Sequence, residues 1–234
     1  MFLSLTLAKD APMSQGLTAI VEGLPYILPG IGVTMSVVAG ALSMGLLLGL
    51  ILSVLLTSAP RPIRRLVGIY VWFFRGIPLL VLLFLFYFGI LASLQIELSP
   101  FTVSVIVLGL ISSAYQSQIL RGAILSLPEG QLKAARAIGM SDSKAIGFII
   151  LPQAMRLAIP GWTNEYTIIM KDSAVTYALG VAEIMARCNH VASRTYQHFW
   201  LYILAGLIFL ALTYIGTKIF HFVEEKVAIK GYAR

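Results

Sequence analysis

The residues best placed to do chemistry are charged side chains inside long apolar runs, and Arg75 is the clearest of them. It follows Arg65 by ten residues, which corresponds to roughly 15 Å of helix, or about half the hydrocarbon thickness of a bilayer. A guanidinium at that depth costs about 2.5–3.5 kcal/mol on insertion scales, so it needs a partner or a water-filled cavity. Its planar fork matches a carboxylate. Arg75 therefore either binds a carboxylate-bearing solute or forms a permanent ion pair, for which Asp172 and Glu165 are candidates.

Patterns typical of catalysis or metal binding are absent from the sequence. His190, His198 and His221 are dispersed and lack ligand spacing, and the single cysteine, Cys188, excludes a disulfide framework and a cysteine-rich metal site. The chain has no G-x-x-x-x-G-K-S/T motif, so it carries no phosphate-binding loop of its own. We therefore predict a non-catalytic chain without a metal site or cofactor.

Composition places these residues in a membrane protein. Of the 234 residues, 59% are hydrophobic and 12% are charged, whereas soluble domains carry about twice that share of charge. The mean hydropathy is +0.90. The apolar runs are continuous rather than alternating, which argues against a transmembrane barrel. The net charge of +7 is explained by positive residues on cytoplasmic loops, so it does not indicate nucleic-acid binding.

Five apolar runs are long enough to cross a bilayer as helices. They cover about residues 30–58, 66–96, 101–120, 146–170 and 196–220. We therefore predict an all-α polytopic membrane protein with five transmembrane helices. Small residues recur every four positions in the first run, which is typical of close helix packing within a bundle or at a dimer contact.

The predicted organisation has three parts. Residues 1–29 form an irregular or interfacial leader on the periplasmic side, punctuated by Pro25 and Pro29 and without an evident cleavable signal peptide. Residues 30–225 form the transmembrane domain, and residues 226–234 a charged cytoplasmic tail.

The positive residues predict the orientation, because five helices place the termini on opposite sides of the membrane. With the N-terminus outside, eleven of the seventeen Lys and Arg residues fall on inner segments and four on outer ones, while Arg75 and Arg156 lie within helices. Positive residues collect on cytoplasmic loops. We therefore predict that the N-terminus is outside and the C-terminus is in the cytoplasm.

This orientation puts a polar segment, residues 128–152, in the cytoplasm. Good helix formers predict a helix over residues 129–138, Gly139 would end it, and Ser141 would cap a second short helix. The first helix would present a compact apolar face to a groove on another protein, or else lie at the membrane surface as an amphipathic loop. That face would consist of Ala134, Ala135 and Ile138.

The run KAARAIGMSDSKAIGFIILP resembles the EAA loop of permease subunits of ATP-binding-cassette importers. In that loop Glu-Ala-Ala is followed after three residues by Gly, and after nine more by Ile-x-Leu-Pro. The matching positions are Ala134, Ala135, Gly139, Ile149, Leu151 and Pro152, and Lys133 stands where the pattern has Glu. Further segments resemble permeases for polar amino acids of the His/Gln/Arg/Glu group; these are residues 74–87, 112–124, 151–166 and 170–175. The resemblance covers about residues 26–225 and implies the five-helix fold of type I importers.

The resemblance also implies partners. Such permeases work in the bacterial inner membrane, surrounded by lipid, as homo- or heterodimers with two ATPase subunits and a periplasmic or lipoprotein amino-acid-binding protein. ATP is then bound by the separate ATPase chain, into which the EAA helix docks. The coupling residues carried over are Lys133, Ala134, Ala135, Ile138, Gly139, Met140 and Ser141. Lys133 changes a charge on that docking surface.

A substrate path follows from the same resemblance. It places Lys171 and Asp172 at the substrate cavity, where Asp172 would take the α-ammonium of a zwitterion, although the residues alone also fit a solvated helix end. Asn164 and Glu165 match the pattern too, and suit a gate, an inter-helix hydrogen bond or a cavity wall. Arg75 completes the predicted path.

Three positions make this path less polar and less acidic than in that group of permeases. Ile77 stands for Thr, Leu82 for Gln and Gln118 for Glu. A neutral or acidic amino acid is therefore favoured over a strongly cationic one. The sequence leaves open which amino acid is carried and whether the second permease chain is identical. An ATPase-independent channel or secondary carrier, with the same charged residues as ion or proton sites, is the alternative function.

Overall fold

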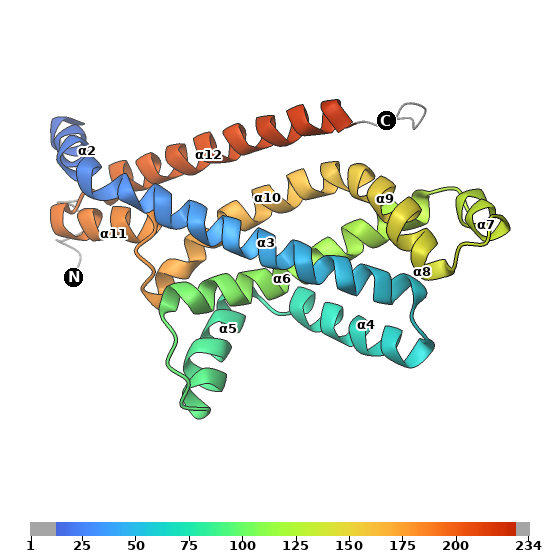
Figure 1. Cartoon of the computed structure of the whole chain (residues 1–234). Helices are drawn as coiled ribbons and strands as arrows, with labels where there is room; N and C mark the ends of the chain where they lie inside the picture. Colours follow the sequence, from blue (N-terminus) through green and yellow to red (C-terminus); the bar gives the residue numbers. More distant parts are fainter. Residues whose placement is uncertain (1–12, 228–234) are drawn as a thin grey trace. The chain divides into compact units, whose positions relative to one another are not determined.

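The computed structural model describes residues 13–227, and within that range all regular structure is helical, so the predicted all-α class is confirmed. Figure 1 shows the helices along the chain. In order they are α2 (Met13–Ile27), α3 (Pro29–Ser58), α4 (Arg61–Gly76), α5 (Leu79–Phe84), η1 (Leu85–Leu91), α6 (Pro100–Ser126), α7 (Gly130–Ala137), α8 (Asp142–Ala145), η2 (Ile146–Ile150), α9 (Leu151–Leu157), α10 (Ile159–Ser173), η3 (Ala174–Leu179), α11 (Ile184–Thr195) and α12 (His198–Val227). The predicted tail, residues 226–234, lies mostly outside the described residues.

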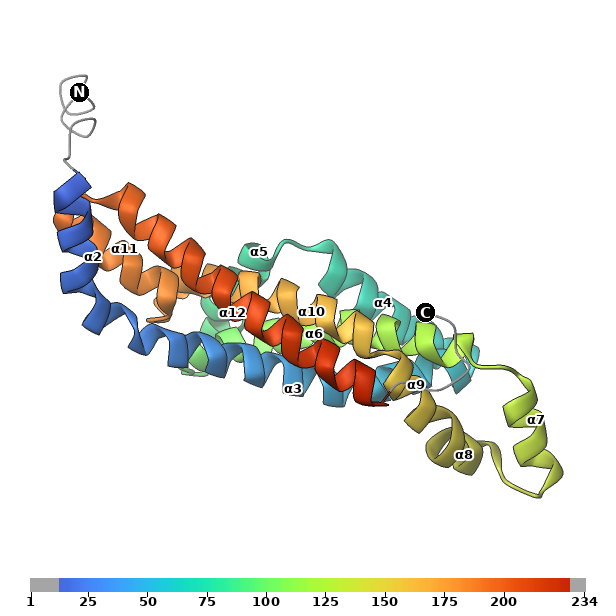
Figure 2. The same cartoon turned by 90° about the horizontal axis from the view of Figure 1, so that it is seen from above.

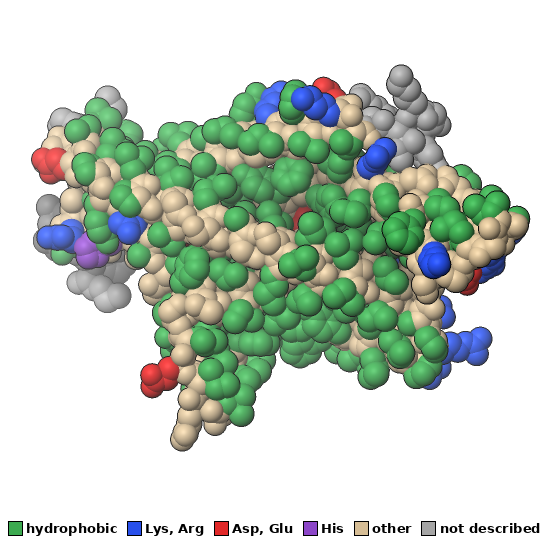
Figure 3. All heavy atoms as spheres, viewed as in Figure 1, with side chains coloured by type: hydrophobic (Ala, Val, Ile, Leu, Met, Phe, Trp, Pro, Cys, Tyr) green, Lys and Arg blue, Asp and Glu red, His purple; other side chains and the backbone are tan. Residues whose placement is uncertain are grey.

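Three helices, α3, α6 and α12, are long and apolar enough to cross a membrane by themselves. Two further pairs pass the same test jointly, although each is bent at a short break: α4 with α5–η1, and α8–α9 with α10–η3. If each pair crosses once, the described chain has five spans, at the places that the sequence predicted. Hydrophobic side chains are spread over the helices on the face seen in Figure 3, as lipid-facing helices require.

Prolines set the breaks. Ile77 precedes Pro78 and is extended, with φ −100° and ψ 134°, because a proline disfavours the helical conformation of the residue before it. Pro160 lies in the first turn of α10, directly after the second break. The basic segment 59–65, which lies between the first two predicted apolar runs, is mostly the first turn of α4, since proline is tolerated there.

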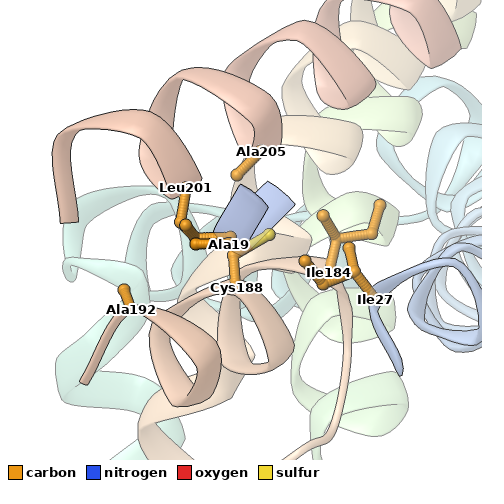
Figure 4. Close-up of a cluster of buried hydrophobic side chains, with 7 residues drawn as sticks. All are labelled: Ala19, Ile27, Ile184, Cys188, Ala192, Leu201 and Ala205. Atoms are coloured by element: carbon orange, nitrogen blue, oxygen red, sulfur yellow. The ribbon is translucent and has the colours of Figure 1, made fainter. Parts of the chain in front are cut away.

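Two compact units make up the chain. The described part of the first comprises residues 13–40, 79–107 and 170–214. Its hydrophobic core joins α2, α11 and α12 (Figure 4), and α2 and α11 lie side by side in Figures 1 and 2. The core residues are Ala19, Ile27, Ile184, Cys188, Ala192, Leu201 and Ala205. Of the two predicted alternatives for the leader, irregular or interfacial, α2 excludes the irregular one over Met13–Ile27, because its apolar face packs into this core and Pro25 is accommodated within the helix.

The second unit comprises residues 41–78, 108–169 and, within the described range, 215–227. Its core lies between the end of α6 and α9, and consists of Leu120, Ala123, Leu127, Ile150, Ala154 and Ala158. Gly45 of α3 allows a close approach to α6, since a Cβ there would lie 2.6 Å from Ser112 Oγ and 2.7 Å from Gln116 Nε2. The small residues of α3 therefore serve packing within the bundle at this position.

Candidate functional site

The helix α7 ends in a Schellman motif at the glycine where the sequence predicted a stop. The amide of Gly139 donates to the carbonyl of Arg136 and that of Met140 to the carbonyl of Ala135, both at 3.0 Å. Gly139 has a φ of 83°, a conformation that is costly for any residue with a Cβ. The turn between α7 and α8 is therefore fixed by the backbone.

Side chains fix the same turn. Arg136 donates from Nε and Nη2 to the two carboxylate oxygens of Asp142 at 2.7 and 3.0 Å. Gln131 and Gln153 exchange amide hydrogen bonds of 2.9 and 2.6 Å, which tie α7 to α9. Ser141 occupies the N-cap position of α8 as predicted, but its side chain makes no capping hydrogen bond. The segment α7–α8 is thus a braced helical hairpin.

The exposed face of α7 differs from the predicted one. Ala134 and Ile138 share an exposed face, whereas Ala135 is 2% exposed and packs inward. The reason is helical spacing, because residues four apart lie above one another while neighbours point about 100° apart. Ile138 is 77% exposed. A single exposed apolar side chain is ordinary on a protein surface, so Ile138 indicates a contact with another protein through its place in the segment that resembles the EAA loop.

A cavity of about 530 Å³ lies in the second unit along α4 and the second half of α6. Arg75 lines it, and its guanidinium carbon lies 4.8 Å from the ring centre of Tyr115. Gln118, Arg121 and Trp72 line it as well. The volume is in the range of small-molecule sites, so the cavity can hold one small solute beside Arg75.

A buried polar network crosses the second unit beside α6. Glu165 of α10 is 1% exposed and accepts a hydrogen bond of 2.7 Å from Ser112. Gln116 donates to Ser112 Oγ at 2.9 Å and to the Leu42 carbonyl of α3 at 3.1 Å. Of the three interpretations offered for Glu165, the structure shows the inter-helix hydrogen bond.

Known proteins match nearly the whole chain. Residues 45–229 match the family described as the inner membrane component of binding-protein-dependent transport systems. The chain belongs to this family. It is 34% identical over 215 residues to an arginine transport system permease protein of Bacillus subtilis, covering 92% of this chain and 98% of the relative. It is 32% identical over 225 residues to an octopine transport system permease protein of Agrobacterium tumefaciens, covering 91% and 94%.

Solved structures agree with this family. The permease superimposes with a TM-score of 0.81 and 31% identity on a chain from the crystal structure of an amino acid ABC transporter with histidines, covering 89% of this chain and 97% of that one. A chain of the MetNI methionine ABC transporter, at 19% identity, gives a TM-score of 0.77 and shows the fold alone. The predicted permease family and type I importer fold are confirmed.

The predicted substrate-path residues divide between the two units of the permease. Arg75, Asn164 and Glu165 belong to the second unit, and Lys171 and Asp172 to the first. Asn164 and Lys171 are exposed, and Asp172, near the end of α10, is half-buried. Each unit therefore holds part of the predicted path.

Arg121 lines the same cavity as Arg75, and it was not among the candidate site residues predicted from the sequence. The predicted third helix ended at about residue 120, just before Arg121, whereas α6 continues to Ser126. A signal was present, because Tyr115, Gln118 and Arg121 recur at intervals of three and so follow one side of a helix.

Proposed function

We propose that this permease forms the membrane pathway of an amino-acid importer that is powered by separate ATP-binding-cassette subunits. Relatives named for arginine and octopine transport, and a solved amino acid transporter, support the substrate class. The observation that carries the coupling to an ATPase is the exposed face of α7, on which Ala134 and the 77% exposed Ile138 stand together.

The hairpin can transmit motion because it is tied to the membrane helices. The Gln131–Gln153 pair connects α7 to α9, and the Arg136–Asp142 pair connects it to α8. A rigid element moves as a whole, so a displacement of α7 by a docked ATPase would reach α9 and α10. Closure of two ATPase subunits around ATP would then move the second unit's polar network at Glu165.

Lys133 gives the docking surface its own charge. Its Nζ lies 3.6 Å from Glu129 Oε2, with side chains 73% and 89% exposed. Glutamate four residues before lysine is the favourable order on a helix. The pair leaves Lys133 at the rim of the exposed α7 face, so we expect the ATPase groove to present an acidic or neutral group to it.

The cavity beside α4 is the proposed binding site for the substrate carboxylate. Arg75 stacked on Tyr115 keeps its N–H groups at the edge of the guanidinium, where a carboxylate can engage two of them. In the first unit, Lys171 and Asp172 are proposed residues of the path, where the carboxylate of Asp172 would attract an α-ammonium. Asn164 and Glu165 belong to the same path, with Glu165 held by Ser112.

Orientation and partners follow from the positive residues and the family. The N-terminus lies outside and the C-terminus in the cytoplasm of the bacterial inner membrane, which puts α7–α8 on the cytoplasmic side. An external amino-acid-binding protein delivers the substrate. A second permease chain, identical or related, completes the pathway.

The test is ATP-dependent uptake of radiolabelled amino acids by proteoliposomes containing the permease, its ATPase and its binding protein. Ile138→Asp should abolish both co-purification with the ATPase and uptake, because it puts a charge on the docking face. Ile138→Val is the matched control and should retain both. Since Ile138 is exposed, neither change disturbs internal packing. Unaltered assembly and uptake in Ile138→Asp would refute docking through α7, and uptake that needs an ion gradient but no ATP would favour the carrier.

A further inference from the structure

The cavity along α4 and α6 holds two guanidinium groups. Arg75 comes from α4 and Arg121 from α6. Its lining residues all belong to the described part of the chain, and none of them is Asp or Glu. The cavity therefore has two cations and no carboxylate in its lining. It suits anionic groups, because guanidinium binds carboxylate in a planar, bidentate manner.

Arg121 has unused hydrogen-bonding capacity. Its Nε atom is buried and has no hydrogen-bond partner within residues 13–227. A buried donor without a partner is unfavourable, and because Nε is enclosed, a solute would engage Arg121 through the part of the side chain that is exposed to the cavity. Arg121 therefore points to a bound anionic group as Arg75 does.

Two positions on α6, one beside Arg75 and the other Arg121 itself, lie the length of a small solute apart. Tyr115, on which Arg75 stacks, lies six residues before Arg121, which corresponds to roughly 9 Å of helix. The neutral amide of Gln118 lies midway between them and also lines the cavity. Arginine side chains are long enough to converge from these positions on the two ends of one solute.

We propose that this cavity binds an acidic amino acid, with the α-carboxylate on Arg75 and the side-chain carboxylate on Arg121. The proposal rests on the proposed function and names its substrate class. Two unpaired cations attract a second carboxylate and repel a basic side chain, so the same walls discriminate against cationic amino acids. Gln118 contributes to that discrimination because a carboxylate at its position would offset one of the two positive charges.

A lipid phosphate offers the same chemistry to the two arginines. Trp72, at the cavity edge, is 75% exposed, so the headgroup of an anionic lipid has access in a bilayer. The two possible ligands, a lipid headgroup and an acidic amino acid, can be distinguished because binding of the amino acid to the cavity does not require anionic lipid. The experiment therefore includes membranes with and without it.

The test is equilibrium binding of radiolabelled L-glutamate, L-glutamine and L-arginine to the purified permease–ATPase complex in nanodiscs, without binding protein. In nanodiscs of phosphatidylcholine alone, glutamate should bind at least about tenfold more tightly than glutamine or arginine. Arg121→Gln should lower glutamate affinity to that of glutamine without changing glutamine affinity, and Arg121→Lys should retain part of the preference. Gln118→Glu should weaken glutamate binding and strengthen arginine binding, which a folding defect would not do.

Each contrary result has a distinct meaning. Equal binding of the three amino acids, with ATP-dependent uptake intact, would overturn the acidic substrate and leave the importer standing. A loss on Arg121→Gln that is equal for all amino acids and occurs only with phosphatidylglycerol would assign Arg121 to lipid and also overturn the proposal. The absence of ATP-dependent uptake of any amino acid would instead contradict the proposed function itself.

Discussion

The α7–α8 hairpin and the Arg75 cavity both use arginine within the second unit, but they use it differently. In the hairpin, Arg136 is engaged by both carboxylate oxygens of Asp142. In the cavity, Arg75 and Arg121 stand among described lining residues that include no acid. An arginine matched by an acid of its own chain holds a shape, whereas a pair of unmatched arginines offers charge to a ligand.

Hydrogen bonds hold each of the two regions separately. The hairpin is held by its Schellman turn, and the cavity by Tyr70 of α4, whose hydroxyl lies 3.0 Å from the Leu110 carbonyl and 2.6 Å from Ser113 Oγ on α6. The groups that they present to a partner differ: Ile138 on the hairpin, and Arg75 and Arg121 in the cavity. Both surfaces are thus held in place by hydrogen bonds, but the hairpin presents an apolar side chain and the cavity presents positive charge.

The largest effect should come from removing the charge of Arg75. Arg75→Ala should lower kcat/KM for uptake by about 100-fold, because a bidentate bond between charged groups contributes about 3 kcal/mol. Assembly with the ATPase should be unchanged, since Arg75 lies outside the hairpin. Arg75→Lys keeps the positive charge but not the planar guanidinium, so its kcat/KM should lie between those of the wild type and Arg75→Ala. Uptake kinetics alongside pull-down of the ATPase separate these outcomes, and normal uptake by Arg75→Ala would remove the cavity from the transport path.

The first unit contains a buried acid, Glu183, that differs from the cavity arginines because its partners are backbone amides and not a solute. Glu183 is fully buried and accepts hydrogen bonds from the amides of Met185 and Ala186 at the start of α11. Burial raises the pKa of Glu183 to about 7, although these two hydrogen bonds lower it. The folded state therefore holds a proton that the unfolded state, with a pKa near 4.5, releases.

The sign of the pH effect follows from this difference. The contribution of Glu183 to the free energy of unfolding is greatest below its unfolded-state pKa. It falls by up to about 3 kcal/mol as the pH rises from about 4.5 to about 7, and is then constant. Glu183→Gln does not titrate, so its stability should change less between pH 5 and pH 8. Cys188 reports unfolding, because it is the sole cysteine and burial, with Glu183 nearby, raises its thiol pKa to about 11. Brief alkylation at one fixed pH after incubation at each test pH measures the unfolded fraction, and equal pH dependence in both proteins would contradict the assignment.

A backbone change should weaken the hairpin without touching the cavity. Gly139→Ala forces a Cβ into a left-handed conformation at a cost of about 1–2 kcal/mol, so ATP-coupled uptake should fall about tenfold while glutamate binding stays constant. Gly130→Ala is the matched control, since Gly130 is helical with open space around it and alanine favours helix. Loss of glutamate binding in Gly139→Ala would show that the two regions are not independent.

The sequence predicted the hairpin better than the cavity. The hairpin is marked by local signals, namely a run of helix formers, Gly139 and Ser141. The sequence therefore predicted the turn at the residues where the structure has it. The cavity depends on which sides of α4 and α6 face each other, and that is set by contacts distant in sequence, such as Tyr70 with Ser113. The helical leader was missed for the same reason, because the packing of α2 on α11 outweighs the local effect of Pro25.

The smallest effect should come from breaking the Arg136–Asp142 pair. Both side chains are more than half exposed, and exposed ion pairs contribute little even when their geometry is good. Arg136→Gln or Asp142→Asn should reduce uptake by only about twofold, and the double variant should lose no more than either single one, because each already removes the same bond. Uptake at low and high salt checks this, since screening should weaken the wild type towards the variants. A loss in Arg136→Gln as large as that in Arg75→Ala would mean that paired and unpaired arginines do the same work, and the distinction between scaffold and binding site would fail.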